Sequence, residues 1–426
     1  MKEPRHPLRV LRLTHDWIAN QLSRVTSTGE VIAEVDGLRF IAISVVVFHH
    51  LMSIYLPSVG RVEKIHTSTD WFAAANQSWL VPFAYCGHFG VNLFFVISGF
   101  ILALPFAKRA FNNLPAPNLK GYYLRRVTRI EPPYVICLLL LFFMLWVDSK
   151  EFLHLIPNLI ASVFYVHGFL FGRESLINSV AWSLEVEIQF YIFVPFLVRL
   201  FRIADARKRR WWLAGLILAF GVFSQEFIYP FGSARLRLTL FNFLHYFLAG
   251  FLLADLYLTN AARLKQKSYT WDLIALACAT FILFTLWAFG HTYFLLPFVV
   301  AGLYAGCCLG KIANRLITWR WIVITGGMCY TIYLYHVPII ARMFWELKSL
   351  SASTLSVTTD FLRMCLLVVP VMFALCAVLF VLAEKPFMRW SLTKREVSNT
   401  EPGAIATKSE QPTLGQSVRK HDEQDF

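Results

Sequence analysis

The apolar residues of this 426-residue chain come in blocks of about 18 to 24, separated by short polar segments that are often basic. An α-helix needs about 20 such residues to cross roughly 30 Å of hydrocarbon. The alternating ten-residue segments typical of a membrane barrel do not occur in the sequence. The pattern predicts an all-α fold, a polytopic membrane bundle of about ten transmembrane helices.

Ten apolar blocks define the predicted crossings. We place them at about residues 38–57, 80–104, 129–147, 180–201, 211–229, 239–258, 272–289, 293–310, 321–343 and 361–383. Residues 151–172 are also apolar, but Pro157 and His167 interrupt them, so we interpret this segment as re-entrant or interfacial on the outer face. Counting it as a crossing would reverse the sidedness of every later loop.

The formal net charge of +14 belongs to the loops rather than to a surface for nucleic acid. Loops that the ten crossings assign to the inside hold more than twice as many Lys and Arg residues as the others, which places both termini in the cytoplasm. With 57% hydrophobic and 15% charged residues, the chain is an integral membrane protein. Its eight cysteines lie almost entirely in apolar blocks without metal-ligand spacing, so we expect neither a metal site nor a disulfide framework.

Three regions follow from composition. Residues 1–32 form a basic cytoplasmic arm, read either as an interfacial helix or as a loosely ordered segment. Residues 33–390 form the membrane domain. Residues 391–426 are polar and predict a disordered cytoplasmic tail.

The first crossing carries ionisable groups, which are costly in a membrane unless they face a protein interior or a watery cavity. Asp36 and Arg39 lie at its start, and His49 and His50 follow. Arg39 and His50 are eleven residues apart, so they lie within about 20° of each other and about 16 Å apart along the axis. A histidine placed there can act as a general base or carry an acyl group.

A second cluster of polar residues opens the third crossing. Arg125, Arg126 and Arg129 stand at spacings that allow their guanidinium groups to gather on one helix face. Such groups suit phosphate or pyrophosphate, and anchoring to anionic lipid headgroups is the alternative.

The segment WSLEVEIQFY, residues 182–191, opens the fourth crossing with two carboxylates. Glu185 and Glu187 are about 200° apart around a helix, so only one of them can face a given cavity. Glu187 and Tyr191 share a face, whereas Trp182 lies about 140° from Glu187. A carboxylate here can orient a histidine or accept a hydrogen bond from a sugar hydroxyl.

Two further segments complete the set of candidate residues. In GVNLFFVISGF, residues 90–100, Ser98 and Gly99 permit close helix contact. In CYTIYLYHVPI, residues 329–339, His336 is a candidate second polar group of the cavity, and a structural role is the alternative.

Taken together, these segments resemble the acyltransferase-3 family of integral membrane acyltransferases. The matching pieces, in order, are DGLR with a histidine eleven residues after its arginine, FFVISGF, RRVTR, WSLEVE, YTIYLYHVP and EKPF. The resemblance covers roughly residues 33–390. No hydrolase domain of the SGNH type follows in this sequence, so we expect a stand-alone form in which the membrane domain or a separate partner completes acyl delivery.

The resemblance implies an acyl-CoA donor, usually acetyl-CoA, and a glycan or lipid-linked sugar acceptor at the outer face of a bacterial cytoplasmic membrane. It assigns catalysis to His50 and Glu187, although a one-residue slip would select His49. It assigns donor binding to Arg39, Arg125, Arg126 and Arg129. Asp36, Ser98, Trp182, Tyr191 and His336 would line the acceptor side or the cavity. The rival interpretation is a transporter or flippase for a lipid-linked or acidic solute.

Overall fold

The computed structural model describes residues 16–25, 32–65, 67–115, 117–149, 153–260, 266–288, 293–352 and 354–388. Within these ranges the chain is mainly helical and forms no β-sheet, which confirms the all-α class and a membrane-like composition. Most of the predicted basic arm and all of the predicted polar tail lie outside the described residues.

The helices follow one another along the chain with short connections. The longer ones are α2 (Ala33–Ser58), α5 (Gly90–Phe111), α6 (Leu119–Ser149), α9 (Trp182–Leu197), α10 (Ala206–Phe223), α13 (Leu240–Thr259), α14 (Tyr269–Ala288), α15 (Leu296–Leu309), α18 (Cys329–Leu347) and α19 (Val357–Leu379). The shorter ones are α3 (Ser68–Ala73), α4 (Val81–Cys86), α7 (Ile156–Val163), α8 (His167–Phe171), α11 (Tyr229–Phe231), α12 (Ala234–Arg237), α16 (Lys311–Ile317) and α17 (Arg320–Gly327).

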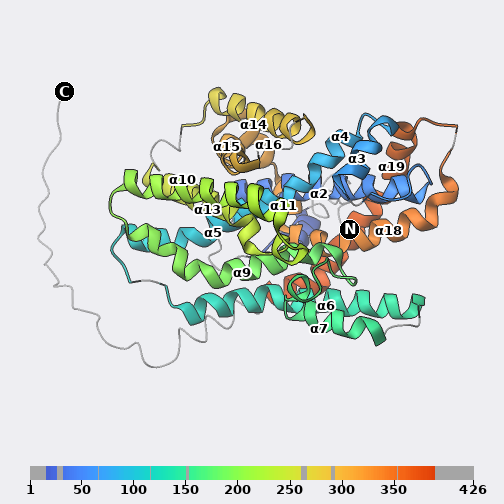
Figure 1. Cartoon of the computed structure of the whole chain (residues 1–426), viewed down its shortest axis with the longest axis horizontal. Helices are drawn as coiled ribbons and strands as arrows, with labels where there is room; N and C mark the ends of the chain where they lie inside the picture. The colour runs from blue at the N-terminus through green and yellow to red at the C-terminus, as the bar shows by residue number, and fades with distance from the viewer. Residues whose placement is uncertain are drawn as a thin grey trace, which may run out of the picture.

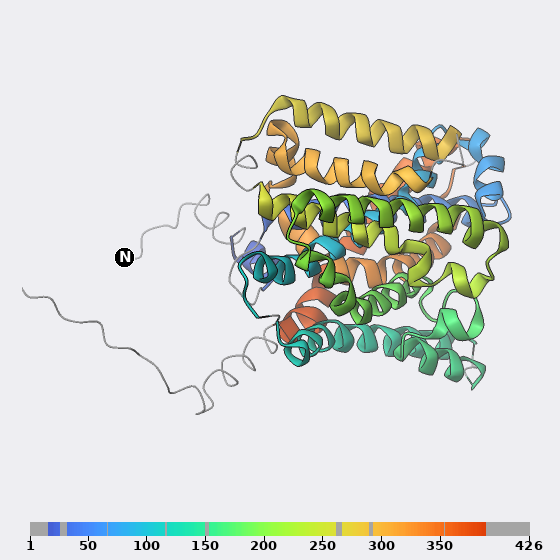
Figure 2. The same ribbon diagram turned by 60° about the vertical axis from the view of Figure 1, so that its left-hand side comes forward.

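Most of the long helices run along a common direction (Figure 1). Helices α14 and α15 form one edge of the bundle and α6 forms the opposite edge, in both views (Figures 1 and 2). Helix α2 lies inside, in contact with α5, α17 and α18. It starts with Glu34 and Asp36 in its first turn, where the helix dipole favours negative charge, and its only proline, Pro57, lies in the last turn.

Six described helical stretches are long and apolar enough to cross a membrane. A seventh is obtained if α17 and α18, which meet at a bend of 71°, are taken as one broken span. Helices occupy every predicted crossing, but the crossing at 321–343 is divided between α17 and α18, and α9 and α15 have 16 and 14 residues. The predicted number of ten crossings is therefore not confirmed. Residues 153–171 form short helices and no helix of spanning length.

Glycines allow α5 and α13 to pack with their backbones in close contact. A Cβ atom added at Gly99 would lie 2.2 Å from the carbonyl oxygen of Phe247 on α13. A Cβ atom added at Gly250 would lie 2.3 Å from the carbonyl oxygen of Val96 on α5. Small residues permit this approach in membrane bundles, and here they bring Ser98 and its neighbours to the interior.

Substituting Gly99→Ala is therefore expected to lower the free energy of unfolding by about 1–3 kcal/mol, because the added methyl must push the two helices apart. Thermal unfolding of the purified protein in detergent measures this. The matched control is Gly215→Ala on α10, where an added Cβ has no neighbour within 4 Å. Equal melting of the two variants would contradict the close packing of α5 and α13.

Candidate active site

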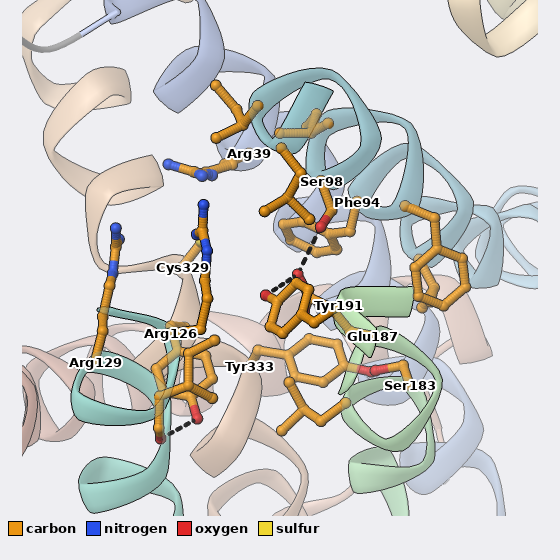
Figure 3. Close-up of a pocket in the computed structure, with 18 of the residues that line it drawn as sticks. Arg39, Phe94, Ser98, Arg126, Arg129, Ser183, Glu187, Tyr191, Cys329 and Tyr333 are labelled. Atoms are coloured by element: carbon orange, nitrogen blue, oxygen red, sulfur yellow. Dashed lines mark hydrogen bonds between the residues drawn. The ribbon is translucent and has the colours of Figure 1, made fainter. Parts of the chain in front are cut away.

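A cavity of about 190 Å³ lies inside the bundle (Figure 3). Helices α2, α5, α6, α9 and α18 supply most of its wall. Apolar side chains cover part of the surface, and the remainder is polar. The polar and polarisable lining residues are Arg24, Arg39, Ser98, Arg126, Arg129, Ser183, Glu187, Tyr191, Cys329, Tyr330, Tyr333 and Glu384.

One side of the cavity is strongly basic. The guanidinium groups of Arg39, Arg126 and Arg129 gather there in Figure 3. Arg39 pairs with Asp36 at 2.7 Å, one turn earlier on α2. Arg126 lies over the ring of Tyr191, with its central carbon 5.6 Å from the ring centroid. Grouped guanidinium forks in a partly dehydrated site bind phosphate or carboxylate groups well.

The other side carries a hydrogen-bonded carboxylate. Glu187 Oε1 accepts hydrogen bonds from the hydroxyl groups of Ser98 at 2.7 Å and Tyr191 at 2.6 Å (Figure 3). The bond to Tyr191 confirms that these two residues share a helix face, as their spacing predicts. Ser98 comes from α5, so Glu187 also joins α5 to α9.

The two carboxylates of α9 point to different places. Glu185 is buried, and its Oε2 accepts a hydrogen bond of 2.8 Å from the backbone N–H of Gly168 in α8. Glu185 therefore fastens the short helices of residues 153–171 to the bundle, while Glu187 faces the cavity. This separation agrees with the spacing of two residues on one helix.

Tyr333 connects the cavity to a cluster of histidines. Its ring lines the cavity and lies 5.9 Å from the ring of His336, which lies 5.1 Å from the ring of His50. Its hydroxyl is 2.6 Å from the hydroxyl of Ser183, another lining residue. Arg39 thus lines the cavity itself, whereas His50 lies outside the lining and is linked to it by the rings of His336 and Tyr333.

The geometry of His336 fixes its protonation pattern. Its Nδ1 lies 3.0 Å and 2.8 Å from the carbonyl oxygens of Ile332 and Tyr333. Because both neighbours only accept, Nδ1 carries the hydrogen and Nε2 keeps a lone pair. This Nε2 is fully buried and has no hydrogen-bond partner among the described residues. The neighbouring ring of His50 can supply the missing donor.

The two adjacent histidines of α2 have different surroundings. The ring of His49 packs 4.9 Å from Trp71 and 5.8 Å from His88, and its Nδ1 makes a 2.9 Å hydrogen bond with the carbonyl oxygen of Ala84. Within the described part of the chain, neither ring nitrogen of His50 has a hydrogen bond. His49 is anchored, and His50 keeps its nitrogens available for chemistry.

The remaining predicted residues lie outside the cavity lining. Asp36 is buried outside the lining and forms an ion pair with Arg39, which lines the cavity. Trp182 packs on Phe243 with ring centroids 5.3 Å apart. Arg125 is exposed on α6 and lies outside the cavity lining. The described residues contain no group of three or more His, Cys, Asp or Glu side chains that could hold a metal ion.

Some lining residues were not predicted. Glu384 belongs to the segment EKPF, and its Oε2 accepts hydrogen bonds from the backbone N–H and the hydroxyl of Thr331. Ser183 and Tyr333 come from segments already singled out, but nothing in their spacing says that they meet. Arg24 comes from the N-terminal arm, whose basic residues suggested only contact with a membrane surface.

These features define the protein as an α-helical membrane protein with a buried, arginine-rich cavity. The chain belongs to the acyltransferase-3 family, because the family model, described as an acyltransferase domain, matches residues 32–383. This confirms the resemblance drawn from the sequence segments. No solved structure matches the chain.

Two relatives illustrate the similarity. The peptidoglycan O-acetyltransferase OatA of Listeria monocytogenes is 27% identical over 344 residues, which covers 72% of this chain and 49% of the relative. A Staphylococcus aureus protein named "Putative O-acetyltransferase SACOL0978" is 24% identical over 341 residues, covering 72% of this chain and 50% of the relative. The chain thus spans about half the length of the curated relatives that it matches.

Proposed function

We propose that the protein is a membrane O-acyltransferase that moves an acyl group, with acetyl as the first candidate, from cytoplasmic acyl-CoA to a hydroxyl of a cell-surface or lipid-linked glycan. The observation that carries this proposal is the connection, through Tyr333, between an arginine-lined cavity and the pair of His50 and His336. Family membership and the O-acetyltransferase names of the relatives support it.

The basic side of the cavity is the proposed site for the phosphates of the donor. Arg39, Arg126 and Arg129 supply guanidinium groups that match phosphate oxygens in charge and geometry. The resemblance adds Arg125, which from its exposed position on α6 would act outside the cavity. The thioester end of the donor then extends along α2 toward His50.

His50 is the proposed base. A nitrogen of its ring takes the proton of the acceptor hydroxyl while the hydroxyl oxygen attacks the thioester carbonyl carbon. The C–S bond then breaks, and the proton passes to the departing thiolate of CoA. In this step the unpartnered Nε2 of His336 would accept a hydrogen bond from the other ring nitrogen of His50 and so orient that ring. The same geometry also serves a two-step route through an acyl-imidazole on His50.

Glu187 is the proposed partner of the acceptor. Its carboxylate, held by Ser98 and Tyr191, is placed to accept a hydrogen bond from a sugar hydroxyl. The name of the Listeria relative supports a glycan acceptor. In this proposal the protein has ten crossings in a bacterial cytoplasmic membrane and both termini in the cytoplasm, so the donor enters from inside and the acceptor from outside.

Purified protein in vesicles is expected to release free CoA from acetyl-CoA through repeated turnovers only when a glycan acceptor is present. Thiol detection follows the release, and mass spectrometry of candidate surface glycans identifies the acetylated product. Glycans from cells with and without the gene provide the acceptor panel. Counterflow of a solute without CoA release for any acceptor would instead identify a transporter and overturn the proposal.

A further inference from the structure

Arg24 lines the cavity although it lies outside the matched family domain, which begins at residue 32. It follows a short helix, residues 16–22, at the start of the described chain. Its side chain is 13% exposed, and its guanidinium nitrogen lies 3.2 Å from Asp36 Oδ1. A segment added before the family domain therefore supplies a fourth arginine to the basic side of the cavity.

The segment that carries Arg24 is held in place at several points. Lys385, which is buried at the end of the last described helical stretch, donates hydrogen bonds to the carbonyl oxygens of Asn20 at 2.8 Å and Gln21 at 2.6 Å. These carbonyls belong to the last turn of the short helix, where a cation is favourable. Asp16, at the other end of the segment, pairs with Arg320 at 2.7 Å.

Two buried guanidinium nitrogens of Arg24 make no hydrogen bond among the described residues. These are Nε and Nη1, of which Nη1 lies 3.2 Å from Asp36 Oδ1, within ion-pair distance. Asp36 lies within ion-pair distance but also serves Arg39, so one carboxylate faces two guanidinium groups. Burial and the nearby Arg39 and Arg129 lower the pKa of Arg24 to about 9.

The charge of the cavity is not balanced by its own carboxylates. Four guanidinium groups line it, and the lining carboxylates are Glu187 and Glu384. Both are already engaged, Glu187 by two hydroxyl groups and Glu384 by Thr331. An anion that accepts several N–H groups at once would complete the site, and phosphate esters do so with charge-assisted bonds.

We infer that the docked segment of residues 16–25 is part of the donor site and that Arg24 binds the phosphates of the acyl-CoA donor. The inference rests on the proposed function and adds a residue that the family domain does not contain. Lys385 acts as a positioning residue, since it fixes the segment without lining the cavity.

The test uses the full-length protein in phosphatidylcholine vesicles, which carry no net anionic headgroup. We expect Arg24→Ala to raise KM for acetyl-CoA about 10- to 100-fold, because bonds between charged groups are lost, with kcat little changed. With S-acetylpantetheine, which has no pyrophosphate, wild type and variant should be equally active. Arg24→Lys should recover part of the affinity, and Lys385→Met should reproduce the Arg24→Ala pattern.

Arg207→Ala is the matched control, since Arg207 is exposed on α10 and lies outside the cavity lining. An unchanged KM for acetyl-CoA in Arg24→Ala would overturn the inference. So would an equal loss with acetyl-CoA and S-acetylpantetheine, because that result indicates a structural role. Wild-type protein that transfers no acetyl group from any donor would instead overturn the proposed function itself.

Discussion

The substitution His50→Ala is expected to reduce acetyl transfer about 10³-fold or more, while leaving acetyl-CoA binding nearly intact. The reason is that the arginines proposed to hold the donor line the cavity, whereas His50 lies outside that lining. A positioned base contributes about 10²- to 10⁴-fold to a proton transfer. Transfer rates per folded protein in vesicles, with donor binding measured separately, check this expectation.

His49→Ala is the internal control for His50→Ala. The His49 ring is fastened to the carbonyl of Ala84 and to Trp71, so its loss should affect stability more than the rate of transfer. Melting temperature and activity are therefore measured on both variants. Equal loss of activity per folded protein in both would refute the assignment of the base to His50. A rapid burst of CoA release without acceptor in wild type, absent from His50→Ala, would identify the acyl-imidazole route.

A second large effect is expected for Glu187→Gln, which should lower kcat about 10²-fold with little change in KM for acetyl-CoA. Glutamine keeps one oxygen for Ser98 and Tyr191, so the local fold should persist. It removes the negative charge that strengthens a hydrogen bond to the acceptor hydroxyl as that hydroxyl loses its proton. Steady-state kinetics with donor and acceptor varied separately distinguish the two effects.

Glu226→Gln is the control for the charge change, because Glu226 is exposed in the π-helical stretch Ser224–Ile228 after α10 and bonds only to its neighbour Gln225 among the described residues. It should behave as wild type. A Glu187→Gln variant with wild-type kcat would exclude a role of this carboxylate in the reaction. A rise in KM for acetyl-CoA that accompanies the fall in kcat would assign Glu187 to donor binding instead.

The spacing of residues along one helix correctly predicted which of their side chains share a face. The i, i+4 pair of Glu187 and Tyr191 is joined by a hydrogen bond, and the separation of Glu185 from Glu187 follows from the helical period. The all-α class follows from the apolar blocks, since a chain in lipid must satisfy its backbone hydrogen bonds internally. Each of these predictions depends on local geometry alone.

Contacts between different helices could not be predicted from the sequence. The first crossing suggested one cavity shared by Arg39 and His50, but His50 lies outside the cavity lining and contacts it through His336 and Tyr333 of α18. Similarly, the charge of Arg24 suits a membrane surface as well as a binding site. The structure is needed to show that Lys385 holds the N-terminal segment against the bundle, where Arg24 lines the cavity. Which helix face meets which neighbour depends on packing that no spacing encodes.

The number of crossings shows a related limit. Hydropathy marks apolar blocks, but a block forms a spanning helix only if it continues without a break. The chain bends by 71° between α17 and α18, and α9 and α15 have 16 and 14 residues. Blocks that look alike in composition therefore differ in length as helices.

Helix α2 is continuous from Ala33 to Ser58, with no proline before Pro57. The interval of eleven residues from Arg39 to His50 is consequently a rigid length of about 16 Å. The separation of Arg39 and His50 therefore sets the length of the proposed donor, because the distance from its phosphates to its thioester must match it. Donors with a shorter arm would leave their thioester short of His50 however tightly their phosphates bind, so the site selects by length as well as by charge.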